Sequence, residues 1–138
     1  MKVVIDTNVL LVCISKRSKL HWIWESLINE LFTLCVTTDI LAEYAEIIEQ
    51  HMGFEAAEDT LSTIENLPNV ERVTVWYRLN LLNDADDNKF VDCAVATNAH
   101  FIVSHDRDFI PLKNIPFPKV EVIDTEILKT KLNITPSV

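Results

Sequence analysis

The sequence predicts a single α/β domain of three layers, with a mostly parallel central sheet between helices. Two short apolar runs rich in β-branched residues, at 3–5 and 101–104, are typical of buried parallel strands. Strand-like and helix-like segments alternate along the chain, which is the pattern of α/β proteins. We expect one domain over residues 1–138 with its core at about 2–124, because a chain of 138 residues can bury most of its apolar surface in one core.

The individual elements follow from the spacing of apolar residues and from capping residues. Thr37 or Thr38 is placed to cap a helix, and Gly53, the only glycine, marks the end of that helix. Asp124 is placed to cap a short terminal helix, and residues after 133 are expected to fray. The expected strands are 3–5, 32–36, 70–75, 101–104 and 119–123, and the expected helices before the terminal one are 20–31, 39–50, 54–65 and 87–99.

The composition predicts a folded cytoplasmic protein without a membrane partner. Hydrophobic residues make up 49% and charged residues 24% of the chain. No apolar run approaches the roughly 18 residues of a membrane helix, and the amino terminus lacks the layout of a secretion signal. Cys13, Cys35 and Cys93 are far apart in apolar surroundings, which predicts reduced thiols in the core.

The formal net charge of −9 argues against nucleic acid as a partner, because binding to phosphates normally rests on an excess of lysine and arginine. Divalent cations bound to several carboxylates would cancel part of this charge and weaken the objection. The basic cluster Lys16, Arg17 and Lys19 is equally compatible with a solvated loop and with contacts to a nucleic-acid backbone.

Two acids closely follow predicted strands that are far apart in the sequence. Asp6 comes directly after the run 3–5, and Asp106 stands two residues beyond the run 101–104. If these strands are neighbours in a parallel sheet, both carboxylates project from the edge where α/β proteins place their ligand sites. We therefore expect Asp6 and Asp106 to lie at a common site.

The helix expected at 39–50 contributes one further candidate. Its apolar residues form a single stripe at helical spacing. Glu43 borders this stripe, whereas Asp39, Glu46 and Glu49 lie round the far side and are expected to be solvated. Glu43 is therefore the acid of this helix best placed to reach a buried edge.

The acid-rich loop 83–88 offers the fourth candidate and several alternatives. Asp87 stands in the first turn above the core-facing side of the next helix, where a plain capping role competes with a site role, and Asp86 could serve as that cap. Asp92 falls on the opposite side of the helix, is expected to be exposed, and is the reserve candidate. Asp84 is interpreted as a loop residue, but the choice of loop acid stays open among these four.

The selected acids come from four separate elements, and converging carboxylates repel one another. Such a group is stable only when it is protonated or bound to a cation. Ligation by oxygen alone suits Mg²⁺ or Mn²⁺, and the four histidines lack the spacing of a zinc site. His105 could approach a substrate. The candidate acids are Asp6, Glu43, Asp87 and Asp106.

Four stretches that contain these acids resemble PIN-domain ribonucleases. Residues 3–10, 39–44, 84–94 and 102–109 are similar, in the same order, to the motifs of that family. The similarity is greatest to the branch that forms the toxins of bacterial and archaeal toxin–antitoxin pairs. The resemblance therefore covers essentially the whole predicted domain.

The resemblance implies a PIN-like fold, a reaction and partners. It implies that the four acids hold Mg²⁺ or Mn²⁺, which activates water to hydrolyse RNA phosphodiester bonds and leaves a 3′-hydroxyl and a 5′-phosphate. It also implies that Asn8 steadies the site, that an antitoxin binds, and that the protein is a homodimer. Single-stranded RNA is the expected substrate, since exposed bases can stack on aromatic side chains. Packing would equally explain the tryptophans available for this role, Trp22, Trp24 and Trp76.

Two other functions compete with this one. A haloacid-dehalogenase-like phosphatase also begins with a strand that ends in Asp, but it needs a second acid two residues later, where this sequence has Asn8. A catalytically degenerate PIN-like module would bind RNA or protein without cleavage. Four intact acids argue against that alternative, because a pure binding module gains nothing from carboxylates that repel one another.

Overall fold

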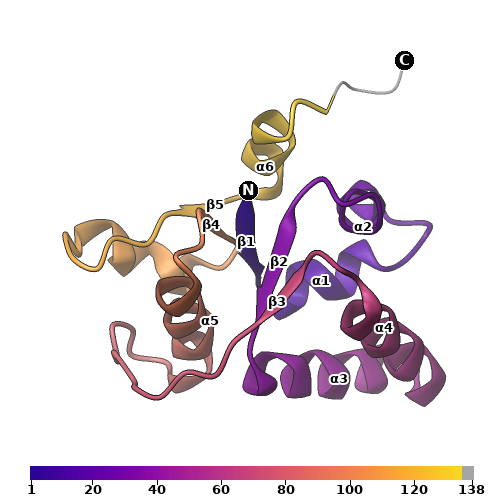
Figure 1. Ribbon diagram of the computed structural model, residues 1–138, viewed down its shortest axis with the longest axis horizontal. Coiled ribbons are helices and arrows are strands. Elements are labelled where there is room, and N and C mark those ends of the chain that lie inside the picture. The colour runs from indigo at the N-terminus through magenta and orange to yellow at the C-terminus, as the bar shows by residue number, and fades with distance from the viewer. Residues whose placement is uncertain (135–138) are drawn as a thin grey trace.

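A sheet of five parallel strands, in the order β3-β2-β1-β4-β5, forms the centre of the computed structural model (Figure 1). The structure describes residues 1–134, so that the expected fraying after 133 lies almost wholly outside the described residues. The predicted parallel sheet is confirmed. Its strands are β1 (Lys2–Ile5), β2 (Thr33–Val36), β3 (Val70–Arg72), β4 (Phe101–Val103) and β5 (Val122–Ile123).

The strands β1 and β4, far apart in the sequence, are direct neighbours. Val4 pairs with Ile102, and Ile5 pairs with Val103. All these side chains are buried, as expected for parallel strands covered on both faces. Asp6 therefore leaves the carboxyl edge of the sheet beside the end of β4, and its backbone N–H donates to the Val103 carbonyl at 3.0 Å.

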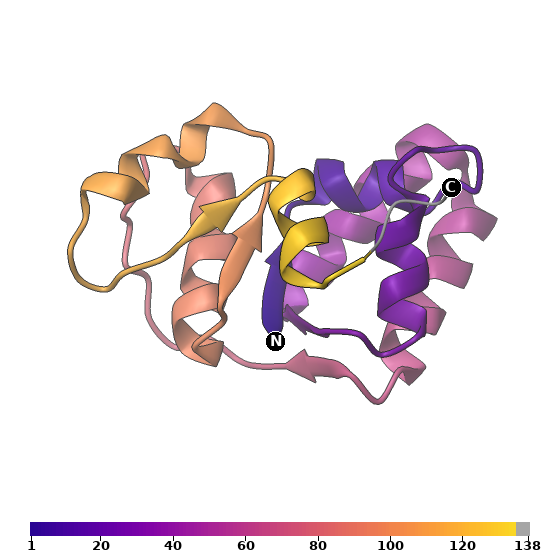
Figure 2. The same cartoon turned by 90° about the horizontal axis from the view of Figure 1, so that it is seen from above.

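Helices cover both faces of the sheet, which confirms the three-layer prediction (Figures 1 and 2). One face carries α5, which packs on β1, β2 and β4, and the other carries the group α1 to α4. A 3₁₀ helix, η1, connects β4 to β5. The helical elements are α1 (Thr7–Cys13), α2 (His21–Ile28), α3 (Thr38–Met52), α4 (Phe54–Asn66), α5 (Ala85–Thr97), η1 (Arg107–Asn114) and α6 (Thr125–Lys131).

Several helix ends lie where the capping residues predict them. Thr37 caps α3 by accepting a hydrogen bond from the Ile40 N–H at 3.2 Å. Gly53, with a φ of 93°, ends α3 in a conformation that favours glycine. Asp124 caps α6 by accepting from the Ile127 N–H at 2.8 Å.

Two helical segments, α1 and η1, are not predicted by the sequence. The residues of α1 include a run of valine and leucine that suits a strand as well as a helix. The segment of η1 contains Pro111, which interrupts a regular helical pattern. Both segments directly follow strands of the sheet, so they determine how the acids at its carboxyl edge are presented.

Other boundaries differ from the prediction by a few residues. β3 ends at Arg72, short of the expected 70–75. Its neighbour β2 ends at Val36, so the residues after Arg72 have no strand residues to pair with. β5 covers only the last two residues of the expected 119–123. α5 begins at Ala85, before the expected start at residue 87, because the side chain of Asp84 caps the helix there.

The core holds the three cysteines as free thiols, as predicted. Burial raises the pKa of the Cys13 and Cys93 thiols to about 12, so both stay protonated and unreactive near neutral pH. Within residues 1–134, the helices are too short or too polar to cross a bilayer.

Candidate metal centre

One hydroxyl group links Asp6 to Asp106 at the carboxyl edge of the sheet. The Ser104 hydroxyl donates to Asp6 Oδ2 at 2.8 Å, and the Asp106 backbone N–H donates to the same Ser104 oxygen at 2.9 Å. Asp6 and Ser104 are buried, whereas Asp106 is exposed. The pairing of β1 with β4 thus brings together the two candidate acids that are farthest apart in the sequence.

The environment of Asp6 disfavours its negative charge. Burial raises the pKa of this carboxyl group, the hydrogen bond from Ser104 lowers it, and the charges of Asp106 and Glu43 raise it again. A nearby cation would reverse this balance and stabilise the charged form. Asp6 therefore has the surroundings expected of a ligand to a positive ion.

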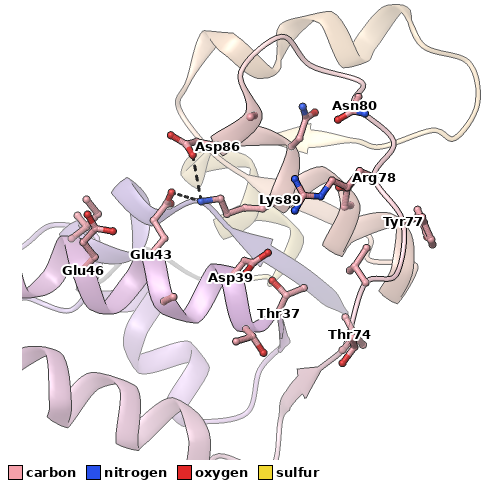
Figure 3. Close-up of a pocket in the computed structure, with 18 residues that line it drawn as sticks. Thr37, Asp39, Glu43, Glu46, Thr74, Tyr77, Arg78, Asn80, Asp86 and Lys89 are labelled. Carbon is pink, nitrogen blue, oxygen red and sulfur yellow. Dashed lines mark hydrogen bonds and ion pairs between the residues drawn. The ribbon is translucent and has the colours of Figure 1, made fainter.

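Glu43 reaches the same edge from α3. Its Oε2 accepts a hydrogen bond from the buried Thr7 hydroxyl, and its Oε1 accepts one from the Lys89 ammonium group of α5 at 2.8 Å. The Glu43 and Lys89 side chains are 20% and 19% exposed. Their ion pair connects α3 with α5 (Figure 3).

Asp87 lies in the first turn of α5 and has an unusual carboxyl group. Burial first, and then the charges of Asp84, Asp106, Asp108 and Asp6, raise its pKa to about 6. Its Oδ2 is buried and has no hydrogen-bond partner among residues 1–134. Such an oxygen is costly to leave unsatisfied, and a hard cation would satisfy it. The donor set around Asp87, all of it carboxylate, therefore fits Mg²⁺ or Mn²⁺.

Asp84 and Asp108 add two acids to this region. Carboxylate oxygens of Asp84, Asp87 and Asp108 all lie within 4.8 Å of one another. Asp84 also caps α5 by accepting from the Asp86 N–H at 2.8 Å. The Asp108 N–H donates to Asp106 Oδ1 at 2.9 Å. Asp108 was not predicted as a ligand, although its place two residues after Asp106 was an available signal.

The sequence matches the profile of the PIN domain over residues 2–108, a range that contains all the acids described above. The chain belongs to the PIN domain family. This membership confirms the resemblance seen in the sequence and removes the phosphatase alternative. No match is found among curated proteins.

Solved structures share the fold of this PIN domain at low sequence identity. A chain of VapBC2 from Rickettsia felis, bound to a DNA fragment from their promoter, is 17% identical, with a TM-score of 0.63 over 90% of this chain and 98% of that chain. Mycobacterium tuberculosis VapC20, described as a sarcin-ricin loop cleaving toxin, is 13% identical, with a TM-score of 0.60 over 86% and 98% of the two chains. VapBC-1 from nontypeable Haemophilus influenzae is 14% identical, with a TM-score of 0.59 over 90% and 98%.

For the loop acids of this PIN domain, the exposure predicted for Asp92 is wrong, and the capping role left open for Asp86 and Asp87 is not found. Asp92 is 7% exposed rather than solvated, because the segment 79–82 packs along α5 and the Leu79 N–H donates to the Asp92 carboxylate at 3.2 Å. The cap of α5 is Asp84, so neither Asp86 nor Asp87 is needed for capping. Asp86 is exposed and lies 3.9 Å from the Lys89 ammonium group.

The remaining candidates of the PIN domain lie at its surface or serve packing. Asn8 is exposed in the first turn of α1, close in the chain to Asp6. His105 is paired with the Thr125 hydroxyl of α6 at 3.0 Å. Trp22 and Trp24 pack against the core, while Trp76 is 89% exposed. The basic residues of the cluster, Lys16, Arg17 and Lys19, are exposed between α1 and α2.

A groove of about 730 Å³ opens beside Glu43, between α3, α5 and the segment 73–80 (Figure 3). Its cationic lining residues are Arg78 and Lys89, and they are outnumbered by acids. The groove is therefore not a basic track for phosphates. Asp6, Asp87 and Asp106 do not line it. The lining acids are Asp39, Glu43, Glu46, Asp86 and Asp92.

Proposed function

We propose that this PIN domain is a Mg²⁺- or Mn²⁺-dependent ribonuclease that hydrolyses phosphodiester bonds in single-stranded RNA. The observation that carries the proposal is the convergence of acids from separate elements around Asp87, whose buried Oδ2 lacks a partner among residues 1–134. Asp6 and Asp106 belong to the same group because Ser104 links them and because both of their charges raise the pKa of Asp87. Carboxylate oxygens gathered in this way suit a hard divalent cation.

In the proposed site, Asp6 and Asp106 hold the ion, and Glu43 and Asp87 complete its ligands or orient the attacking water. When bound, the ion would lower the pKa of that water and stabilise the negative charge on the leaving oxygen. Ser104 restrains the Asp6 carboxylate, so that the site is preorganised before RNA binds. Asn8 steadies the site beside Asp6, and the products carry a 3′-hydroxyl and a 5′-phosphate.

We further propose that the protein is the toxin of a toxin–antitoxin pair. The structural likeness to VapC20, described as a cleaving toxin, and to chains of VapBC structures supports this role. An antitoxin protein is then the expected partner, a homodimer the expected assembly and the cytoplasm the expected location. Light scattering coupled to gel filtration tests the dimer, and a monomeric mass would contradict it.

Replacement of Asp6 by Asn tests the catalytic proposal. The variant keeps a side chain that can accept from Ser104 but loses the charge, so Mn²⁺-dependent cleavage should fall by roughly 10²–10³-fold. The melting temperature should stay near that of the wild type. A fluorescently labelled single-stranded RNA reports cleavage.

Asp39→Asn is the matched control for this experiment. It removes one carboxylate from an exposed position of α3 and should leave cleavage unchanged. Cleavage that survives in purified Asp6→Asn would mean that a contaminating nuclease or a different site is responsible.

Calorimetric titration with Mn²⁺ separates the nuclease from a degenerate binding module. The proposed nuclease binds the ion in the absence of RNA, because its acids repel one another without a cation. A wild-type protein that binds RNA but no Mn²⁺ would instead support the degenerate module.

A further inference from the structure

Lys89 is the single cation within ion-pair distance of the site acids among residues 1–134. Its ammonium group lies 2.8 Å from Glu43 Oε1 and 3.9 Å from Asp86 Oδ1. The other ion pairs of the described residues involve Glu71 and Glu25, which lie on other elements. The Lys89 side chain extends from α5 toward α3 and meets Glu43 at the side of the groove (Figure 3).

The two sides of the acid group differ in how their charge is compensated. Both oxygens of Glu43 are engaged, one by the Thr7 hydroxyl and one by the Lys89 ammonium group. Asp6 has a neutral donor, Ser104, and Asp87 has a buried oxygen without a donor in the described part of the chain. The need for a positive ion is therefore greatest around Asp6 and Asp87.

We propose that Lys89 is a resident cation of the site, which neutralises Glu43 and leaves one divalent ion to bind the remaining acids. This inference rests on the proposed function and refines it in two respects. The protein then binds one Mn²⁺ rather than two, because Lys89 occupies the position beside Glu43 where a second ion would find its ligand. Glu43 then acts as a positioning residue, held between α3 and α5, rather than as a ligand.

The Mn²⁺ affinity of Lys89 variants, measured by calorimetric titration without RNA, tests the inference. The wild type should bind one ion per chain. Lys89→Gln should bind Mn²⁺ about tenfold more tightly, because a positive charge near the ion has been removed and Glu43 has been released. Lys89→Arg keeps the charge and should bind as the wild type does.

A matched control separates this local effect from a change in net charge. Lys119→Gln also removes one positive charge, but from an exposed residue that precedes β5. It should leave Mn²⁺ affinity unchanged. A control that tightens binding as much as Lys89→Gln would overturn the inference, and so would a wild type that binds two ions.

The double variant Glu43→Gln/Lys89→Gln distinguishes positioning from ligation, because it removes the ion pair without altering the net charge. If Glu43 is not a ligand, the double variant should bind Mn²⁺ within about twofold of the wild type, whereas Asp106→Asn should bind it at least about tenfold more weakly. Circular dichroism shows whether each variant is folded. If the double variant is unfolded, the Mn²⁺ affinity of Lys89→Gln alone tests the inference.

The outcomes also separate this inference from the proposed function. A double variant that loses Mn²⁺ as Asp106→Asn does would make Glu43 a direct ligand, which overturns the inference while metal-dependent cleavage stands. A wild-type protein that binds no Mn²⁺ at all would overturn both.

Discussion

The surroundings of the Asp87 carboxyl group strongly disfavour its negative charge. Its pKa is raised from 3.8 to about 6, chiefly by burial and then by four neighbouring aspartates. Between these values the folded protein holds a proton that the unfolded chain has released. The free energy of unfolding of the metal-free protein must therefore fall as the pH rises through this range.

Asp87→Asn should stabilise the metal-free protein at about pH 8 by about 1 kcal/mol and have little effect at about pH 4. The pKa rise corresponds to about 3 kcal/mol at full strength, and contact with water at this partly exposed group reduces the effect. Urea unfolding in the presence of a chelator measures it. The exposed Asp59→Asn is the control, and a loss of stability of Asp87→Asn at about pH 8 would contradict the argument.

Single residues were predictable where the local sequence is distinctive. An acid that follows a charge-free strand stands out, which is why Asp6 and Asp106 could be selected. Lys89 could not, because its contact depends on how α3 and α5 lie over the end of the sheet. The exposure predicted for Asp92 was wrong because helical phase takes no account of the segment 79–82 that covers it.

The position of α3 determines where Glu43 lies. Tyr44, on the buried side of this helix, donates its hydroxyl to the Ile5 carbonyl at the end of β1. The first turn is fixed by Thr37, whose hydroxyl oxygen accepts from the Ile40 N–H. Cap and tyrosine together hold one helix against the edge of the sheet where the acids gather.

Thr37→Ala should lower the free energy of unfolding by about 1 kcal/mol, because the Ile40 N–H loses its side-chain acceptor at a buried helix end. Thr130→Ala should cost less, since that exposed hydroxyl bonds only within its own helix, α6. Thermal or urea unfolding compares the two. Equal losses in both variants would show that the cap has no special role.

Helices and strands were predictable where the spacing of apolar residues agrees with the residues that cap or end the element. The helix that ends at Gly53 has an amphipathic stripe, a threonine cap and a glycine stop, and its predicted bounds are nearly correct. α1 has none of these signals, and no side chain caps it. The extent of β3 depends on the length of its neighbour β2, which a local pattern does not contain.

At the scale of the whole molecule, the net charge of −9 makes the fold sensitive to cations. Several of the acids are not scattered but share one edge of the sheet, where burial and neighbouring carboxylates raise the pKa values of Asp6 and Asp87. Binding of the proposed divalent ion there would stabilise the folded state alone, because the unfolded chain separates the acids.

Mn²⁺ should therefore stabilise the wild type by about 2.7 kcal/mol at a free concentration 100 times its dissociation constant. Asp106→Asn, which should bind the ion at least about tenfold more weakly, should show at most about half of this stabilisation at the same concentration. The stabilisation should shrink at about pH 5, where Asp87 binds a proton that competes with the ion. Differential scanning fluorimetry with and without a chelator provides the measurement, and equal shifts for both proteins would contradict a metal site at this edge.

The hydroxyl of Ser104 joins an aspartate from the beginning of the chain to one that follows the fourth strand. A growing polypeptide on the ribosome exposes Asp6 early, but it has nothing to complete the pocket until residues 101–106 have emerged and β4 has paired with β1. A translation product that ends before these residues therefore cannot assemble the proposed site. If the protein is the toxin proposed above, its own synthesis is protected, since the chain cannot cleave RNA until residues 101–106 have left the ribosome.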